Sequence, residues 1–164
     1  MRLLRFFIIS ALVLLLLLFG IGMLMPSRVV VSRAIDLPVA RSKVLPLLQN
    51  TQKWPLWMQD LDSSTVSMVN DSTFQLGKLR VNWIIRNDSL LISEWHSPKG
   101  TMQLSTMQLI SIPEGQGCTV QWQFEQAVGW WPWERLGSMM NEKIMGPQLQ
   151  TNLQRLSDHL LTTP

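Results

Sequence analysis

An apolar run near the start of the chain most constrains what this sequence can fold into. Residues Phe6 to Met25, FFIISALVLLLLLFGIGMLM, contain no charged side chain and a single hydroxyl group, that of Ser10. A helix of this length is about 30 Å long, which matches the hydrocarbon thickness of a bilayer. The run predicts a transmembrane helix, and it divides the 164-residue chain into an N-terminal anchor, residues 1–26, and a folded domain, residues 27–164.

A cleaved signal peptide is the alternative interpretation of this run. The apolar cores of signal peptides are usually about 7–15 residues long and end at a small-x-small cleavage site. This run is longer, and Gly20-Ile21-Gly22 is a poor cleavage site before Met23-Leu24-Met25. No cysteine directly follows the run, which excludes a lipoprotein signal. We therefore expect an uncleaved anchor whose residues 6–25 contact the lipid bilayer.

The charges on the two sides of the run bear on its orientation. Arg2, Arg5 and the N-terminal amine precede it and favour a cytoplasmic N-terminus. Basic residues on the other side argue for the opposite orientation; they are Arg28, Arg33, Arg41 and Lys43. A short basic leader before an apolar run usually stays inside. We therefore expect a single-pass protein of a bacterial inner (cytoplasmic) membrane, with the domain on the periplasmic side.

The folded domain is nearly neutral and carries few groups suited to metal chemistry. Without Arg2 and Arg5, the 14 basic residues of the chain become 12, against 11 acidic residues. No stripe of Lys and Arg is present, so we expect no nucleic-acid partner. The single cysteine, Cys118, allows neither an internal disulfide nor a cysteine-based zinc site, and His96 and His159 lie far apart. We expect no metal and no cofactor.

The first part of the domain predicts one strand followed by short helices. Arg28 to Asp36 is rich in β-branched residues and predicts a strand. Val39 to Leu48 has helix-like apolar spacing, but Pro46 interrupts it, so this helix is short or starts late. Asn50 to Asp62 predicts a turn and a short helix.

The middle of the domain, Thr65 to Ala127, alternates between apolar and polar residues. The clearest example is Cys118 to Glu125, CTVQWQFE, whose period of two is typical of a strand with one buried face. The same pattern in Leu79 to Ile85 places Leu79, Val81, Trp83 and Ile85 on one face. Turn residues interrupt the pattern at Asn70-Asp71, Asn87-Asp88, Ser97 to Gly100 and Pro113 to Gly117. This spacing predicts an antiparallel meander.

The end of the chain predicts a long helix. Apolar residues recur there at helical spacing, at Leu149, Leu153, Leu156 and Leu160. We expect the helix to begin near Trp133, with Gly146-Pro147 as a kink or a restart.

The two ends of the domain resemble a known superfamily. SRVVVSRAIDLPVARSKVLPLLQNTQKWPLW resembles the opening strand, Pro-containing turn and helix, and Trp-x-x-Trp segment, here Trp54 and Trp57, of START-like (SRPBCC, polyketide cyclase/dehydrase-like) proteins. WPWERLGSMMNEKIMGPQLQTNLQRL resembles the C-terminal helix of a membrane-anchored bacterial branch. The resemblance covers Ser27 to Leu161, and Pro46 departs from it. It implies an α+β helix-grip fold, in which a curved antiparallel sheet surrounds a long C-terminal helix beside a cavity.

Aromatic and methionine side chains are the candidates for a ligand-binding lining. Such residues form an adaptable apolar wall, and the alternative is that they fill an ordinary core. The candidates are Trp57, Trp83, Trp95, Trp122, Phe124, Trp131, Trp133 and Met140. Trp130, Trp131 and Trp133 have a third interpretation, as a contact with the membrane–water interface.

Support for catalysis is weak, and we predict no catalytic residue. Glu94 and His96 share one face of a strand, but Trp95 between them points inward, so the pair is expected on the wet outer face. Cys118 is expected to be an inert buried thiol.

The leading hypothesis is a membrane-anchored domain that binds a small hydrophobic or amphipathic, lipid-like ligand non-covalently. The alternatives are a non-catalytic envelope interaction or structural module with a vestigial cavity and, third, an enzyme.

Overall fold

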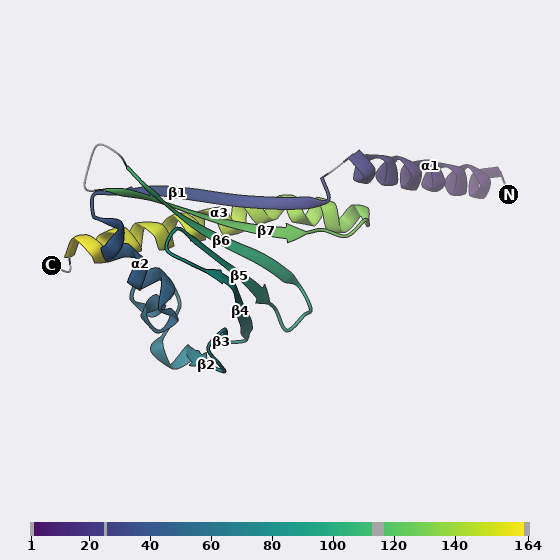
Figure 1. Ribbon diagram of the computed structural model, residues 1–164. Helices are drawn as coiled ribbons and strands as arrows, with labels where there is room; N and C mark the ends of the chain where they lie inside the picture. Colours follow the sequence, from purple (N-terminus) through teal and green to yellow (C-terminus); the bar gives the residue numbers. More distant parts are fainter. Residues whose placement is uncertain (1, 25, 113–116, 163–164) are drawn as a thin grey trace.

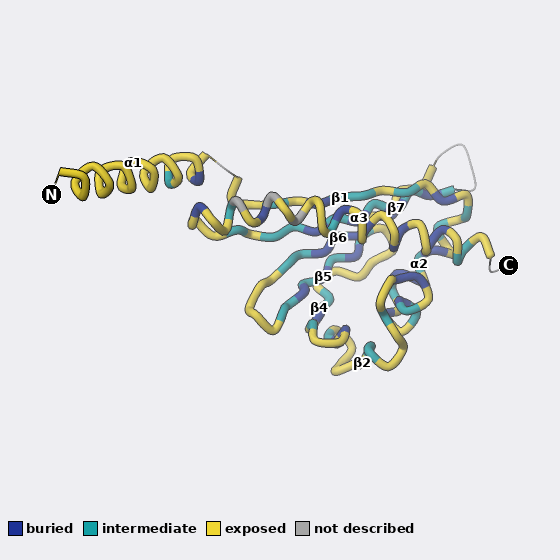
Figure 2. The backbone as a smooth tube through the Cα atoms, turned by 180° about the vertical axis from the view of Figure 1, so that it is seen from behind, coloured by how far each residue is buried: buried dark blue, intermediate teal, exposed yellow. Residues whose placement is uncertain are grey.

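A long apolar helix extends outward from one end of the folded domain (Figure 1). The structure is a computed structural model that describes residues 2–24, 26–112 and 117–162. Helix α1, Arg2–Leu24, is followed at once by strand β1, Arg28–Leu37. Nearly every residue of α1 is exposed, whereas the buried residues of the chain gather in the domain (Figure 2).

Seven antiparallel strands form one sheet. Besides β1 they are β2 (Val66–Met68), β3 (Thr73–Leu76), β4 (Leu79–Arg86), β5 (Leu90–His96), β6 (Met102–Ser111) and β7 (Cys118–Ala127). The order across the sheet is β1-β7-β6-β5-β4-β3-β2. Strands β2 to β7 are therefore the predicted meander, and β1 completes the sheet by pairing along its whole length with β7, Arg28 opposite Ala127 and Leu37 opposite Cys118.

Helices cover one face of the sheet. The first group is α2 (Arg41–Gln49) and two short 3-10 helices, Thr51–Leu56 and Ser63–Thr65. The last helix, α3 (Pro132–Thr162), runs along β1 (Figure 1). Pro46 lies inside α2, and Pro147 lies inside α3, which continues through it without a restart. The predicted α+β helix-grip fold is confirmed.

Two of the predicted turns are held by asparagine side chains. Asn70 Oδ1 accepts hydrogen bonds from the backbone N–H groups of Ser72 (3.0 Å) and Thr73 (2.7 Å). Asn87 repeats this pattern between β4 and β5. A third predicted turn contains Gly100, whose φ of 81° is one that glycine adopts without strain. Residues 113–116, in the fourth predicted turn, lie outside the described residues.

A β-bulge makes one prediction about β4 wrong. Trp83 pairs with Ser93, but Ile85 pairs with Ile92, so β4 contains one residue more than β5 at this point. A bulge of one residue moves every following side chain to the opposite face. Ile85 is therefore exposed rather than on the inner face with Trp83.

Candidate ligand-binding cavity

A cavity of about 180 Å³ lies between α3 and the sheet. Its walls come from three parts of the chain that are distant in sequence. Leu79, Trp95, Gln103, Trp122 and Phe124 contribute from the sheet, Met58 from the segment after the first 3-10 helix, and Met145, Gln148, Leu149 and Asn152 from α3. No residue of this lining carries a formal charge, so the cavity suits an uncharged, mainly apolar group.

The aromatic wall of the cavity is fixed by hydrogen bonds and ring contacts. Trp95 Nε1 donates to Ser93 Oγ at 3.0 Å, and Trp122 Nε1 donates to Ser105 Oγ at 2.9 Å. Phe124 lies between these two indoles, with ring centroids 5.2 Å from Trp95 and 5.5 Å from Trp122. Because both buried indole N–H groups are bonded to serine, the rings are oriented before any ligand arrives.

Three side-chain amides supply the polar part of the lining. Asn152 is buried, and its Oδ1 accepts from the backbone N–H of Gln59 at 2.7 Å. Gln103 Nε2 donates to Gln126 Oε1 at 3.0 Å. Gln148 is exposed, which places the opening of the cavity beside it on α3. The arrangement offers hydrogen bonds at the opening and an apolar interior.

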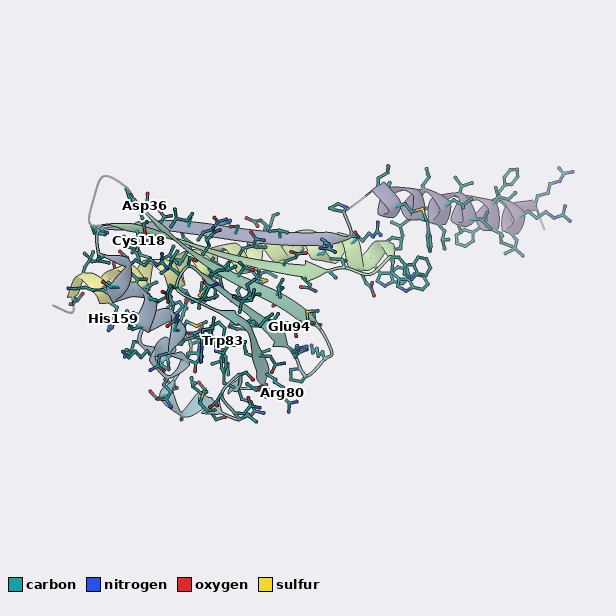
Figure 3. The ribbon with its side chains drawn as sticks, in the orientation of Figure 1. Asp36, Arg80, Trp83, Glu94, Cys118 and His159 are labelled. Atoms are coloured by element: carbon teal, nitrogen blue, oxygen red, sulfur yellow. The ribbon has the colours of Figure 1, made fainter. Side chains whose placement is uncertain are left out.

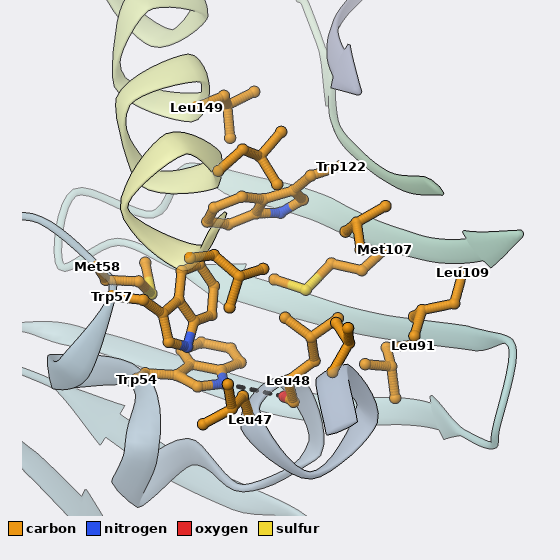
Figure 4. Packing of buried hydrophobic residues seen from close by; sticks show 14 of the residues in the cluster. Leu47, Leu48, Trp54, Trp57, Met58, Leu91, Met107, Leu109, Trp122 and Leu149 are labelled. Carbon is orange, nitrogen blue, oxygen red and sulfur yellow. Dashed lines mark hydrogen bonds between the residues drawn. The ribbon is translucent and has the colours of Figure 1, made fainter. Parts of the chain in front are cut away.

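Two predicted lining residues lie behind this wall rather than in it. Trp57 is fully buried and contacts Trp122 edge-on, with ring centroids 5.6 Å apart. Trp83 packs on Trp54 and Phe74. The indole N–H groups of Trp57 and Trp83 are buried and have no hydrogen-bond partner among the described residues. The rings of Trp57 and Trp54 meet edge-on within this packing, with centroids 6.1 Å apart (Figure 4).

Three other predicted lining residues lie away from the cavity. Trp131, Trp133 and Met140 are in or just before the first turns of α3, and all three are exposed on the surface. Of the eight candidates, the structure thus brings Trp95, Trp122 and Phe124 to the cavity.

The remaining lining residues were not among the sequence candidates. The sequence does place Leu149 on the apolar face of the last helix. Gln103, Gln148 and Asn152 are polar and carry no periodic signal, so only the packed fold reveals them.

Among the described residues, no ionisable side chain lines the cavity. His96 Nε2 lies 3.4 Å from Glu94 Oε2, and both side chains are partly exposed on the outer face, as predicted. Burial raises the pKa of the Cys118 thiol, and the positive charge of Arg41 opposes this only in part. Figure 3 shows Glu94 and Cys118 at separate places on the sheet. No group of three or more His, Cys, Asp and Glu side chains is arranged to hold a metal among the described residues.

Comparison with known proteins identifies the fold. No protein-family profile and no curated protein sequence matches the chain. Solved structures do match: XoxI from Bacillus cereus has 14% sequence identity and a TM-score of 0.66, over 81% of this chain and 96% of that one. A START superfamily protein from Mycobacterium smegmatis has 11% identity and a TM-score of 0.61, over 82% and 99%. DynU16, a protein in the dynemicin biosynthetic locus, has 13% identity and a TM-score of 0.60, over 81% of this chain and 47% of its own.

Proposed function

We propose that this chain, which has the fold of START-like proteins, is a membrane-anchored domain that binds a small hydrophobic or amphipathic, lipid-like molecule non-covalently. The observation that carries the proposal is the uncharged cavity between α3 and the sheet. An apolar cavity of about 150 Å³ is large enough to bind benzene. The volume of about 180 Å³ therefore accommodates one six-membered ring or a short branched chain.

The size of the cavity also limits how much of a ligand enters it. Pockets for drug-sized ligands usually measure about 300–1,000 Å³, so this cavity encloses only part of a lipid-like molecule. The remainder of such a ligand would lie outside the opening, beside the exposed Gln148 and the amide of Gln103. An amphipathic ligand fits this division, with its apolar end inside and its polar end at the amides.

The exposure of α1 supports the membrane anchor. Among the described residues, α1 is the one helix that is long and apolar enough to cross a membrane. It is not the core helix of a soluble domain, because almost all of its residues are exposed (Figure 2). A helix that is apolar on every side is stable in lipid rather than in water. The basic leader, Arg2 and Arg5, favours the periplasmic side for the domain.

The packing of the domain interior favours a second candidate, the envelope interaction or structural module with a vestigial cavity. Trp54, Trp57 and Trp122 fill much of the space between the helices and the sheet (Figure 4). If this candidate is correct, the purified protein carries one stoichiometric protein partner and no small molecule.

Methionine methyl groups provide a direct test of ligand binding. Met58 and Met145 line the cavity, whereas Met68 lies outside its lining and is exposed. In full-length protein held in lipid nanodiscs, with ¹³C-labelled methionine methyl groups, benzene should shift the Met58 and Met145 resonances and leave Met68 unchanged.

A matched pair of variants controls this experiment. Leu149→Trp fills the cavity and should remove the benzene-induced shifts, whereas Leu160→Trp makes the same change elsewhere on α3 and should retain them. Unshifted Met58 and Met145 in the wild-type protein at saturating benzene would exclude a functional cavity.

A further inference from the structure

Three tryptophans form a stacked cluster on the surface where β7 leads into α3. Ring centroids are 4.2 Å apart between Trp130 and Trp131, and 4.5 Å apart between Trp131 and Trp133. The exposed fractions of these residues are 57%, 36% and 56%, respectively. We call them the surface tryptophan cluster. Contiguous apolar surface of this kind marks an interaction site.

The membrane-spanning helix lies directly against this cluster. The ring of Phe19 in α1 is 6.1 Å from that of Trp130 and 6.2 Å from that of Trp131, centroid to centroid. Phe19 precedes the end of α1 at Leu24 by five residues, which is about 7.5 Å along a helix axis. Side chains that contact Phe19 therefore lie near the boundary of the hydrocarbon layer when α1 spans a bilayer.

Polar and steric contacts fix the domain to the end of α1. Arg135 Nη1 donates to the carbonyl oxygen of Gly22 at 2.8 Å and to that of Met23 at 3.4 Å. These carbonyls belong to the last turn of α1, where a helix has no internal donors and a partial negative charge. Gly22 also packs so closely on Pro132 that a Cβ at this position would lie 2.9 Å from the Cβ of Pro132.

We propose that the surface tryptophan cluster inserts into the interfacial region of the membrane leaflet from which α1 emerges. The proposal rests on the membrane anchor proposed above. Because Phe19 of that anchor contacts the cluster, lipid is the partner that we assign to the cluster. Tryptophan prefers the membrane–water interface because its ring is apolar and its N–H is polar. These three tryptophans are exposed, so lipid headgroups and water can reach them.

The proposed membrane contact and the cavity lie at different places along α3. Met145, the first cavity residue on α3, follows Trp133 by 12 residues, which is about 18 Å along the helix. The cluster is therefore a device that holds the domain against the membrane, and the ligand-binding cavity is a distinct site farther along α3.

Fluorescence quenching by brominated lipids tests the insertion. All eight tryptophans of the chain lie in the domain and none in α1, so membrane quenching of tryptophan reports the domain alone. Full-length protein in vesicles that contain lipids brominated near the headgroup should lose part of its emission. The triple variant Trp130→Phe, Trp131→Phe, Trp133→Phe should lose most of this quenching. The variant Trp83→Phe, which changes a ring that packs on Trp54 and Phe74 outside the cavity lining, is the control and should retain it.

A second measurement on the same vesicles separates the two proposals. Protein that remains with the vesicles after extraction at high pH is anchored. If anchored wild-type protein shows no quenching, or the triple variant is quenched as strongly as the wild type, the cluster does not insert, although the anchor stands. If the protein is extracted, the anchor itself is refuted.

Discussion

The chain contains two groups of tryptophans that are alike in chemistry and opposite in environment. Trp54, Trp57, Trp95 and Trp122 are buried between the helices and the sheet, whereas the surface tryptophan cluster is exposed beside α1. Both groups contain stacked rings, with centroids 5.9 Å apart for Trp54 and Trp95 and 4.2 Å apart for Trp130 and Trp131. Ring stacking alone therefore does not tell whether a tryptophan belongs to a core.

Three of the four buried tryptophans donate their indole N–H groups to an acceptor in the protein. Trp54 Nε1 donates to the carbonyl oxygen of Leu48 at 2.9 Å, and Trp95 and Trp122 donate to serines. A buried donor without a partner costs free energy, so a protein core usually supplies acceptors; the buried Nε1 of Trp57 has none among the described residues. The indoles of the surface cluster are exposed instead, so headgroups or water can reach their donors. Burial therefore separates the two groups, and the exposed one is the surface that we propose contacts the membrane.

The largest expected effect comes from removing a core ring. Trp54 is fully buried and contacts four other aromatic rings among the described residues. Trp54→Ala should lower the free energy of unfolding by about 3–5 kcal/mol because it leaves a large cavity. The matched surface change, Trp133→Ala, should alter it by at most about 0.5 kcal/mol. Denaturant unfolding of the full-length protein in detergent measures both, and equal losses would contradict the comparison.

Removing an acceptor from the core should have a smaller effect. Ser105→Ala leaves the Trp122 N–H buried without its partner. We expect a loss of about 1–3 kcal/mol in the same unfolding experiment. The double variant Ser105→Ala with Trp122→Phe removes the donor as well, so it should be less destabilised than the sum of its two single variants. Simple additivity would mean that the hydrogen bond contributes nothing.

Weakening the contact between the domain and α1 should have a smaller effect again. Arg135→Gln loses the charge-assisted bonds to Gly22 and Met23, which we expect to weaken the joint by about 1 kcal/mol. Trypsin should then cleave after Arg28, next to the joint, about fivefold faster, since about 1 kcal/mol corresponds to that ratio. Arg86→Gln, which changes an arginine of β4 outside the joint, is the control. An unchanged rate of cleavage in Arg135→Gln would show that the joint does not depend on this arginine.

The smallest expected signal is the reactivity of Cys118 in the folded protein. Its side chain is fully buried, and burial raises the pKa of the thiol. The reactive thiolate therefore forms at higher pH in the folded than in the unfolded protein. Between pH 7 and 9 a disulfide reagent should label the unfolded chain increasingly fast and the native chain hardly at all. Rapid labelling of the native chain would show that the reagent reaches Cys118 in the folded protein, which contradicts its burial.

Local sequence patterns predict the fold well and the site only in part. The alternation in Cys118 to Glu125 reports the two faces of β7 because burial of one face repeats every second residue. The same rule fails at Ile85, since a bulge interrupts the period without a signal in the residues themselves. Trp122 and Phe124 are found by alternation.

The rest of the site depends on packing between distant segments. Gln103 and Asn152 line the cavity because of where β6 and α3 meet, which no local pattern records. The cavity volume likewise depends on how the rings of Trp95, Trp122 and Phe124 pack. Proximity in sequence makes Trp131 and Trp133 conspicuous, yet the structure places them beside α1 instead of the cavity.

Native mass spectrometry of the full-length protein, ejected from nanodiscs formed directly from its own membrane, tests the central claim most directly. We predict an intact chain of 18.8 kDa, which retains the anchor, with one small molecule bound at a one-to-one ratio. The Leu149→Trp variant should have the same chain mass without the bound molecule, and Leu160→Trp should retain it. A shortened chain without residues 1–26, or an intact wild-type chain with no bound molecule, would contradict the account.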